Sequence, residues 1–127
     1  MDAEKLSRRW LLAAVAYFLV SVGLGTYMGA SGRHELFSVH SHAALLGWAS
    51  MGLTALLYRS FPDAARSRLA PWHFYLYQLA VPAMLVAVAA LVTGRKEAEP
   101  VAGLASAVLL VSVLLFCWIV LTTRKGA

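Results

Sequence analysis

Apolar residues along this chain gather into four long runs separated by short polar segments. Each run approaches the roughly 20 residues that an α-helix needs to cross a hydrocarbon core about 30 Å thick. Because the connections are short, consecutive helices are expected to run in opposite directions. The pattern predicts an all-α membrane protein, an antiparallel bundle or arc forming one domain over residues 1–127, with four transmembrane helices at about residues 10–30, 39–58, 72–92 and 101–122.

Composition and charge support a membrane location. Of the 127 residues, 61% are hydrophobic and only 13% are charged, proportions that a soluble domain does not show. Most basic residues fall at one end of the predicted helices, namely Lys5, Arg8, Arg9, Arg59, Arg66, Arg68, Arg124 and Lys125, against Arg33, Arg95 and Lys96 at the other. Loops rich in Lys and Arg stay cytoplasmic. We therefore expect cytoplasmic termini in a bacterial-type inner membrane, with residues 34–42 on the outer side.

The net charge of +5 does not require a nucleic-acid partner. Basic residues at the ends of membrane spans set the topology and meet anionic lipid headgroups. The first apolar run is too long for the core of a signal peptide and has no convincing cleavage site, so it is expected to be a helix of the mature protein.

Three histidines lie within nine residues, where a polar loop meets the second apolar run: His34, His40 and His42. An ionisable side chain in a membrane helix is costly and indicates a function by default. Because an α-helix turns by about 100° per residue, His40 and His42 point about 200° apart. The two rings are therefore expected to face opposite flanks of one helix and to serve two different sites.

The helix that follows the histidine pair carries small or apolar side chains beside both rings, so a large flat ligand could approach it. The expected faces are Ala43, Ala44 and Gly47 beside His40, and Leu45, Leu46 and Ala49 beside His42. Neutral imidazole is a good axial ligand for haem iron, and imidazole clusters also suit copper. The pattern permits haem b on His40 and His42, with copper held by all three histidines as the weaker alternative.

The segment VHSHAALLGWASMGLTALLYRSFP, residues 39–62, resembles the tenth helix of the catalytic subunit of haem-copper oxidases, most closely the C-type oxidases and bacterial nitric oxide reductases. The resemblance lies in an H-x-H pair that leads into a Leu-Gly-Trp step. It implies that His40 ligates a high-spin haem and His42 a low-spin haem. That subunit has twelve helices in three arcs of four, so the resemblance implies that this chain is one arc and that a homotrimer rebuilds all twelve.

The chain also departs from that family. It has no separate set of copper-site histidines, no candidate for a His-Tyr crosslink and no acidic residue in the middle of a span. An oxygen-reducing or nitric-oxide-reducing enzyme is therefore not expected. The sequence favours a b-type cytochrome for electron transfer, or for redox or gas sensing, in which each haem lies between His40 of one copy and His42 of the next.

Alternatives remain open for both the oligomer and the function. A cyclic tetramer would give each haem two histidine ligands, as a trimer would. A twofold dimer could instead place the same histidine from both copies on one haem. The second functional candidate is a haem-free accessory or assembly protein of four helices, or a copper-binding factor. The sequence does not indicate a redox partner.

Several further residues carry weaker expectations. Arg33 is either a partner of a haem propionate or a solvated loop cation, and His34 is a possible third metal ligand oriented by Glu35. His73 lies a membrane thickness from the pair and is expected at the interface rather than on a metal. Cys117 is expected as a packing residue.

Two groups of residues are expected to shape the helices. Gly25 and Gly29 form a small-residue face on which another helix can lie close. The predicted anchors at the membrane interface are Trp10, Tyr58, Trp72, Tyr75, Tyr77 and Trp118.

Overall fold

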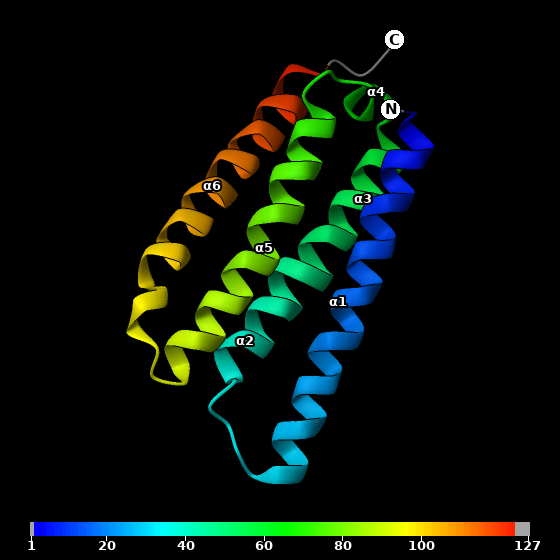
Figure 1. Ribbon diagram of the computed structural model, residues 1–127. Coiled ribbons are helices and arrows are strands. Elements are labelled where there is room, and N and C mark those ends of the chain that lie inside the picture. Colours follow the sequence, from blue (N-terminus) through cyan, green and yellow to red (C-terminus); the bar gives the residue numbers. More distant parts are fainter. Residues whose placement is uncertain (1, 124–127) are drawn as a thin grey trace.

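The computed structural model describes residues 2–123, and every regular element in this range is a helix (Figure 1). The prediction of an all-α fold is confirmed. In chain order the elements are α1 (Ala3–Ser31), α2 (Phe37–His42), the π-helix η1 (Ala43–Ala49), α3 (Ser50–Ser60), α4 (Pro62–Ala65), α5 (Ala70–Val92), the 3-10 helix η2 (Lys96–Ala98) and α6 (Glu99–Thr122).

Within the described residues, three helices are long and apolar enough to cross a membrane: Ala3–Ser31, Ala70–Val92 and Lys96–Thr122. They coincide with the first, third and fourth predicted spans and are compatible with an integral membrane protein. The second predicted span is an uninterrupted helical run made of α2, η1 and α3. That this run also crosses the membrane stays a prediction.

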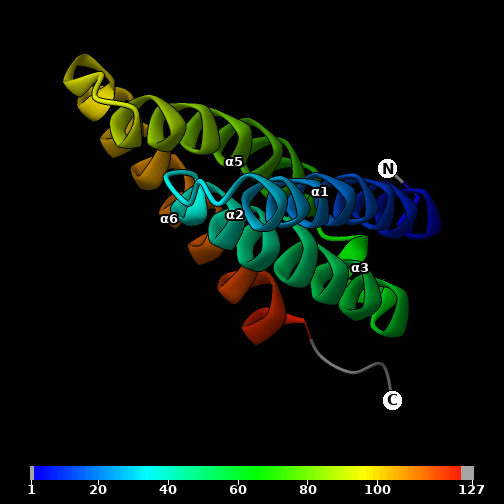
Figure 2. The ribbon, with the colours of Figure 1, turned by 90° about the horizontal axis from the view of Figure 1, so that it is seen from below.

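The helices form two antiparallel hairpins. One hairpin pairs α1 with the run α2–η1–α3, and the other pairs α5 with α6. Viewed along the helices, α6 follows α5 at one edge of the molecule, while α1 and α3 lie side by side at the other (Figure 2). Gly32 ends α1 in the left-handed backbone conformation, with φ of 69°, and its N–H donates to the carbonyl of Met28.

The first hairpin is closely packed at Gly47. A β-carbon added there would collide with Cβ and Cγ of Tyr17 on α1. At Gly52, one turn further on, an added β-carbon would make only an ordinary contact with Ala14, at 3.9 Å. Gly47 therefore sets how near α1 lies to the second helical run.

The predicted aromatic anchors divide into two groups. Trp72, Tyr75 and Trp118 are exposed, as interface residues should be. Trp10, Tyr58 and Tyr77 are buried, so the prediction was wrong for these three, because they lie on the helix faces where the two hairpins meet. Trp10 packs edge-on against Phe74 and Tyr77 of α5, with ring centroids 5.2 Å apart in each case. The large rings hold the hairpins together. Cys117, expected as a packing residue, has an exposed side chain on α6.

We predict that Gly47→Ala destabilises the first hairpin. Replacing glycine with alanine in a helix ordinarily gains about 0.5–1 kcal/mol, but overpacking a tight contact costs about 1–3 kcal/mol. The melting temperature of the detergent-solubilised protein should fall for Gly47→Ala and stay level or rise for the matched control Gly52→Ala. Equal melting temperatures for the two variants would show that α1 does not lie this close to Gly47.

Candidate functional site

His40 is fixed between α2 and α1. The Nδ1–H of its ring donates to the backbone carbonyl of Ser21 at 2.7 Å, and the Ser21 hydroxyl donates to the carbonyl of His40 at 3.3 Å. Gly25 leaves room for the ring, since a β-carbon there would lie 3.1 Å from its Cε1. A carbonyl oxygen can only accept, so this contact requires a proton on Nδ1; in the neutral ring, Nε2 then carries the free lone pair.

His42 is fixed in the same way, but by its own helix. Its Nδ1–H donates to the carbonyl of Ser38, one turn earlier, at 2.7 Å. The ring is half-buried, as is that of His40. Both imidazoles are therefore held with Nδ1 on a backbone carbonyl, which is how ligating histidines are usually oriented, with Nε2 of the neutral ring as the metal-binding atom.

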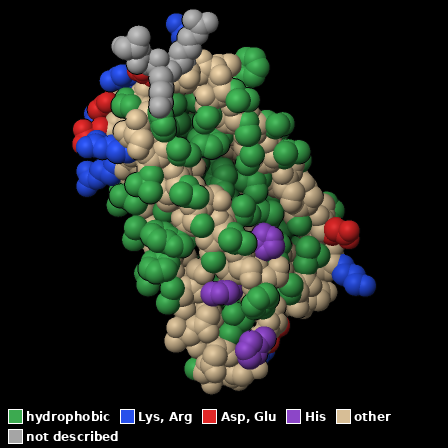
Figure 3. Space-filling model, turned by 180° about the vertical axis from the view of Figure 1, so that it is seen from behind, with side chains coloured by type: hydrophobic (Ala, Val, Ile, Leu, Met, Phe, Trp, Pro, Cys, Tyr) green, Lys and Arg blue, Asp and Glu red, His purple; other side chains and the backbone are tan. Residues whose placement is uncertain are grey.

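The two histidines belong to different surroundings, because the ring of His40 lies against α1 while that of His42 is bonded only to α2. Histidine side chains show on one face of the molecule, in the half opposite the clustered Lys and Arg residues (Figure 3). Over residues 2–123 the structure brings no three His, Cys, Asp or Glu side chains together that could hold a metal ion.

The loop before α2 contains its own pair of charges. Arg33 and Glu35 form an exposed ion pair at 2.6 Å, and Nδ1 of His34 donates to the carbonyl of Gly32 at 3.0 Å. The backbone N–H of Glu35, together with the Arg33 guanidinium, lowers the pKa of Glu35 below its ordinary value. The expectation that Glu35 orients His34 was wrong, because Glu35 binds Arg33 and His34 is held by the backbone.

The surface beside His40 differs from the expected one. Ala43 and Gly47 are buried, Ala44 is half-buried, and Tyr17 covers Gly47. Ala43 and Gly47 are therefore not open to a planar macrocycle within this chain, contrary to expectation, whereas Ala44 is partly exposed. Two physical causes account for it: α1 occupies this flank, and the residues after His42 form a π-helix, whose wider turn breaks the α-helical spacing.

The surface beside His42 is more open. Leu45 is 65% exposed, and Leu46 and Ala49 are half-buried. From the other hairpin, the hydroxyl of Tyr77 donates to the Leu46 carbonyl at 3.0 Å. The flank of His42 is therefore more exposed than the flank of His40, which lies against α1.

His73 belongs to the core and not to the membrane interface, contrary to expectation. Its ring is 1% exposed, its Nδ1 lies 2.9 Å from the Tyr58 hydroxyl, and it stacks on Phe116 with centroids 4.9 Å apart. The hydroxyl of Ser112 donates to the His73 carbonyl at 2.9 Å. His73 thus links α3, α5 and α6 and has a structural role.

Of the two serines that orient the site histidines, only one could have been predicted from the sequence. Ser38 precedes His42 by four positions, so helical spacing alone places its carbonyl beside the ring. Ser21 lies nineteen residues before His40 on another helix. No local pattern connects Ser21 to His40, and the contact depends on how the hairpin packs.

Comparison with protein-family models, with curated proteins and with solved structures found no match to this chain.

We predict that Gly25→Ala disturbs the His40 ring. A methyl group 3.1 Å from Cε1 must push the imidazole aside and weaken its bond to Ser21. In ¹⁵N-histidine spectra the fraction of the Nδ1–H tautomer of His40 should fall, while His42 stays unchanged. The control is Gly23→Ala, whose added carbon meets nothing within 4 Å. A His40 signal that is the same in both variants would contradict the contact.

We also predict that Tyr58→Phe weakens the core. The substitution leaves Nδ1 of His73 buried without its partner, which costs about 1–3 kcal/mol. The free energy of unfolding, measured in mixed detergent micelles, should fall by about this amount. Tyr75→Phe removes a hydroxyl from an exposed ring and should have little effect. Equal losses in the two variants would indicate that the Tyr58–His73 bond contributes nothing.

Proposed function

We propose that this chain is a b-type membrane cytochrome that acts as a homo-oligomer, with a trimer favoured. His40 and His42 supply axial ligands to haem b at the boundaries between copies, and the protein transfers electrons or senses redox state or gases. The run α2–η1–α3 is the second of four spans. The termini are cytoplasmic, and the histidine pair lies near the outer surface of a bacterial-type inner membrane.

The observation that carries this proposal is the matched anchoring of the two rings. Each Nδ1 is 2.7 Å from a backbone carbonyl oxygen, one on α1 and one on α2. Two imidazoles at neighbouring positions that are both held with Nε2 free are prepared for two separate metal contacts. A hydrogen bond to a carbonyl also raises the basicity of the ring and strengthens its bond to iron.

The protein residues then have distinct tasks. Haem, when bound, would supply a one-electron couple, and two histidine ligands from the protein would favour electron exchange over binding of a gas. Ser21 and Ser38 fix the tautomers and the ring planes. Gly25 leaves room for the His40 ring against α1, and Leu45 presents an apolar surface on the flank of His42.

The resemblance to haem-copper oxidases covers one helix, and the H-x-H pair on that helix fits this assignment. By position, His40 matches the residue that binds the high-spin haem in that family and His42 the one that binds the low-spin haem; in the proposed homotrimer, which restores twelve helices, each low-spin haem takes His40 of one copy and His42 of the next. Arg33 is available to a haem propionate only if its exposed pair with Glu35 opens, which costs little because exposed ion pairs are weak.

The test is an absorption spectrum of the protein purified in detergent. We expect a Soret band, a pyridine haemochrome of haem b, low-spin bis-histidine electron paramagnetic resonance signals, and an oligomer mass that is a multiple of 13.7 kDa. His40→Ala and His42→Ala should each abolish low-spin bis-histidine ligation, because each haem takes one ligand of each kind. His34→Ala serves as the control and should keep the spectrum.

The proposal fails if haem loading is complete in the double variant His40→Ala with His42→Ala, or if the protein is monomeric and stays colourless after haem is supplied. Metal analysis distinguishes the second functional candidate. Stoichiometric copper without a Soret band would replace the cytochrome with a copper-binding protein.

A further inference from the structure

The π-helix η1 deprives one backbone carbonyl of its usual donor. In an α-helix the N–H of residue 50 would donate to the carbonyl of residue 46. Here the N–H of Ser50 donates instead to the carbonyl of Leu45, five residues earlier, and the Ser50 hydroxyl donates to the same oxygen at 2.7 Å. The carbonyl of Leu46 has therefore lost its α-helical donor. Leu46 is half-buried, and a backbone carbonyl away from water needs a partner.

Tyr77 of α5 supplies the missing donor. Its hydroxyl donates to the Leu46 carbonyl at 3.0 Å. The Tyr77 side chain is 4% exposed, and its ring packs edge-on against Trp10 and His73, with centroids 5.2 and 5.9 Å away. Because both neighbouring rings are themselves buried, the hydroxyl is held in one place. The second hairpin thus contacts the first at the segment that follows the histidine pair.

The helices on both sides of η1 are each hydrogen-bonded to α1. In α2, His40 donates to the carbonyl of Ser21, and in α3 the carbonyl of Ala55 accepts from the Ser7 hydroxyl at 2.9 Å. Fourteen residues separate Ser7 from Ser21 along α1. Fifteen separate His40 from Ala55 along the second helical run. A π-helical turn takes in one residue more than an α-helical turn, so η1 accommodates the additional residue while both contacts are kept.

Relaxation of η1 into an α-helix would turn α2 relative to α3. The change is that of one residue, about 100° and about 1.5 Å. The helix α3 is held in the core, where Met51 is fully buried, so the short helix α2 is the part that would turn. This motion would take the His40 ring away from Ser21. His42 is bonded to Ser38 within α2 and would keep its partner.

We infer that Tyr77 is a positioning residue for His40. Its hydroxyl stabilises the π-helix through the Leu46 carbonyl, and the π-helix keeps the His40 ring on the carbonyl of Ser21. The second hairpin thereby sets the direction in which this imidazole presents its Nε2. The use of that direction for haem ligation rests on the proposed function, whereas the position of the ring does not.

The experiment is Tyr77→Phe, studied by ¹⁵N-histidine spectra of the full-length protein in detergent without added haem. The substitution removes the hydroxyl and keeps the ring. The ratio of the Nδ1–H to the Nε2–H tautomer of His40 should fall about fivefold, as expected when one neutral hydrogen bond is lost. The spectrum of His42 should stay unchanged and serves as the internal reference.

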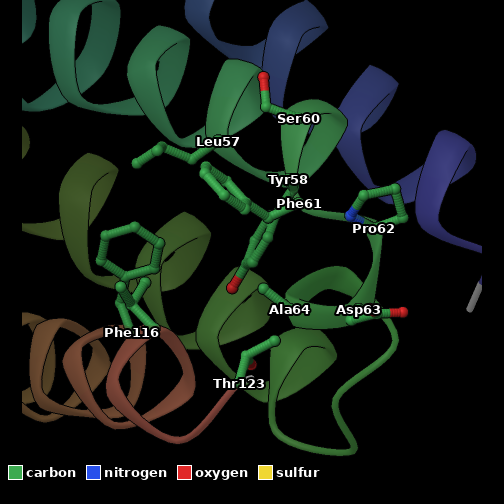
Figure 4. A pocket seen from close by; sticks show the side chains of 10 residues that line it. Leu57, Tyr58, Ser60, Phe61, Pro62, Asp63, Ala64, Phe116 and Thr123 are labelled. Atoms are coloured by element: carbon green, nitrogen blue, oxygen red, sulfur yellow. The ribbon is translucent and has the colours of Figure 1, made fainter. Parts of the chain in front are cut away.

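The matched control is Tyr58→Phe. Tyr58 is also buried and also donates its hydroxyl across helices, but it lies near the far end of α3, where it lines a hollow beside α4 (Figure 4). This variant should be less stable and should leave the His40 spectrum unaltered. An unaltered His40 spectrum in Tyr77→Phe would overturn the inference. An equal change in both variants would overturn it too, because lost stability would then explain the effect.

Deletion of Ala49 tests whether the hydroxyl acts through the π-helix. Ser50 then follows Leu45 by four positions and Met51 follows Leu46 by four, so backbone N–H groups can satisfy both carbonyls. In this shortened chain, with helicity checked by circular dichroism, adding Tyr77→Phe should no longer change the His40 spectrum. A change as large as in the full chain would refute the role of the π-helix.

The same experiment separates this inference from the proposed function. If His40 responds to Tyr77→Phe and the protein binds no haem when haem is supplied, the positioning role is supported and only the cytochrome proposal fails. If haem binds and His40 does not respond, the cytochrome proposal stands and Tyr77 is a core residue without influence on the site.

Discussion

The close approach of α1 to the helical run α2–η1–α3 is the contact on which the site geometry depends. Lipid tails are as apolar as leucine side chains, so helices in a membrane associate through packing and hydrogen bonds. Here the packing is provided by two positions without a side chain. Gly47 makes room for Tyr17, and Gly25 makes room for the ring of His40. The buried Ser21 then connects the same two helices through its backbone carbonyl and its hydroxyl.

The π-helix adds a second constraint directly after the histidine pair. Both histidines lie in the short α-helix α2, so their separation of about 200° follows ordinary α-helical geometry. From Ala43 onward the turn widens, and the hydroxyl of Ser50 donates to the carbonyl of Leu45 five residues earlier at 2.7 Å. Residues after the pair are therefore displaced around the helix axis relative to an α-helix. π-helical segments of this kind often occur at functional sites.

Hydropathy predicted the long helices closely where apolar residues define their ends. The expected span at 72–92 is α5 (Ala70–Val92), and that at 101–122 is α6 (Glu99–Thr122). The first helix begins earlier than expected, at Ala3, because charged residues that leave the hydrocarbon can continue a helix into water. Apolar length predicts where a chain can cross the membrane and does not predict where its helix stops.

Only those features of the candidate site that depend on a single helix could be predicted from the sequence. The opposed directions of His40 and His42 follow from their spacing, and so does the carbonyl of Ser38 beside His42. The contacts of His40 with α1, and the burial of His73 beside Tyr58, depend on which helix faces become neighbours after the hairpins form. Aromatic residues at span ends occur both as interface anchors and as core residues, so composition alone did not distinguish Trp10 from Trp72.

The asymmetry between the two flanks bears on how copies would assemble under the proposed function. His40 is bordered by α1 of its own chain, while the flank of His42 is open. A haem that takes one ligand of each kind would join two different surfaces, and such heterologous contacts form a ring where the rotation between copies closes and a filament where it does not. A twofold contact through His42 alone would leave His40 without a haem partner. Exposed apolar area cannot decide between these arrangements, because lipid covers such surfaces as well as protein does, so the ligand geometry is the stronger criterion.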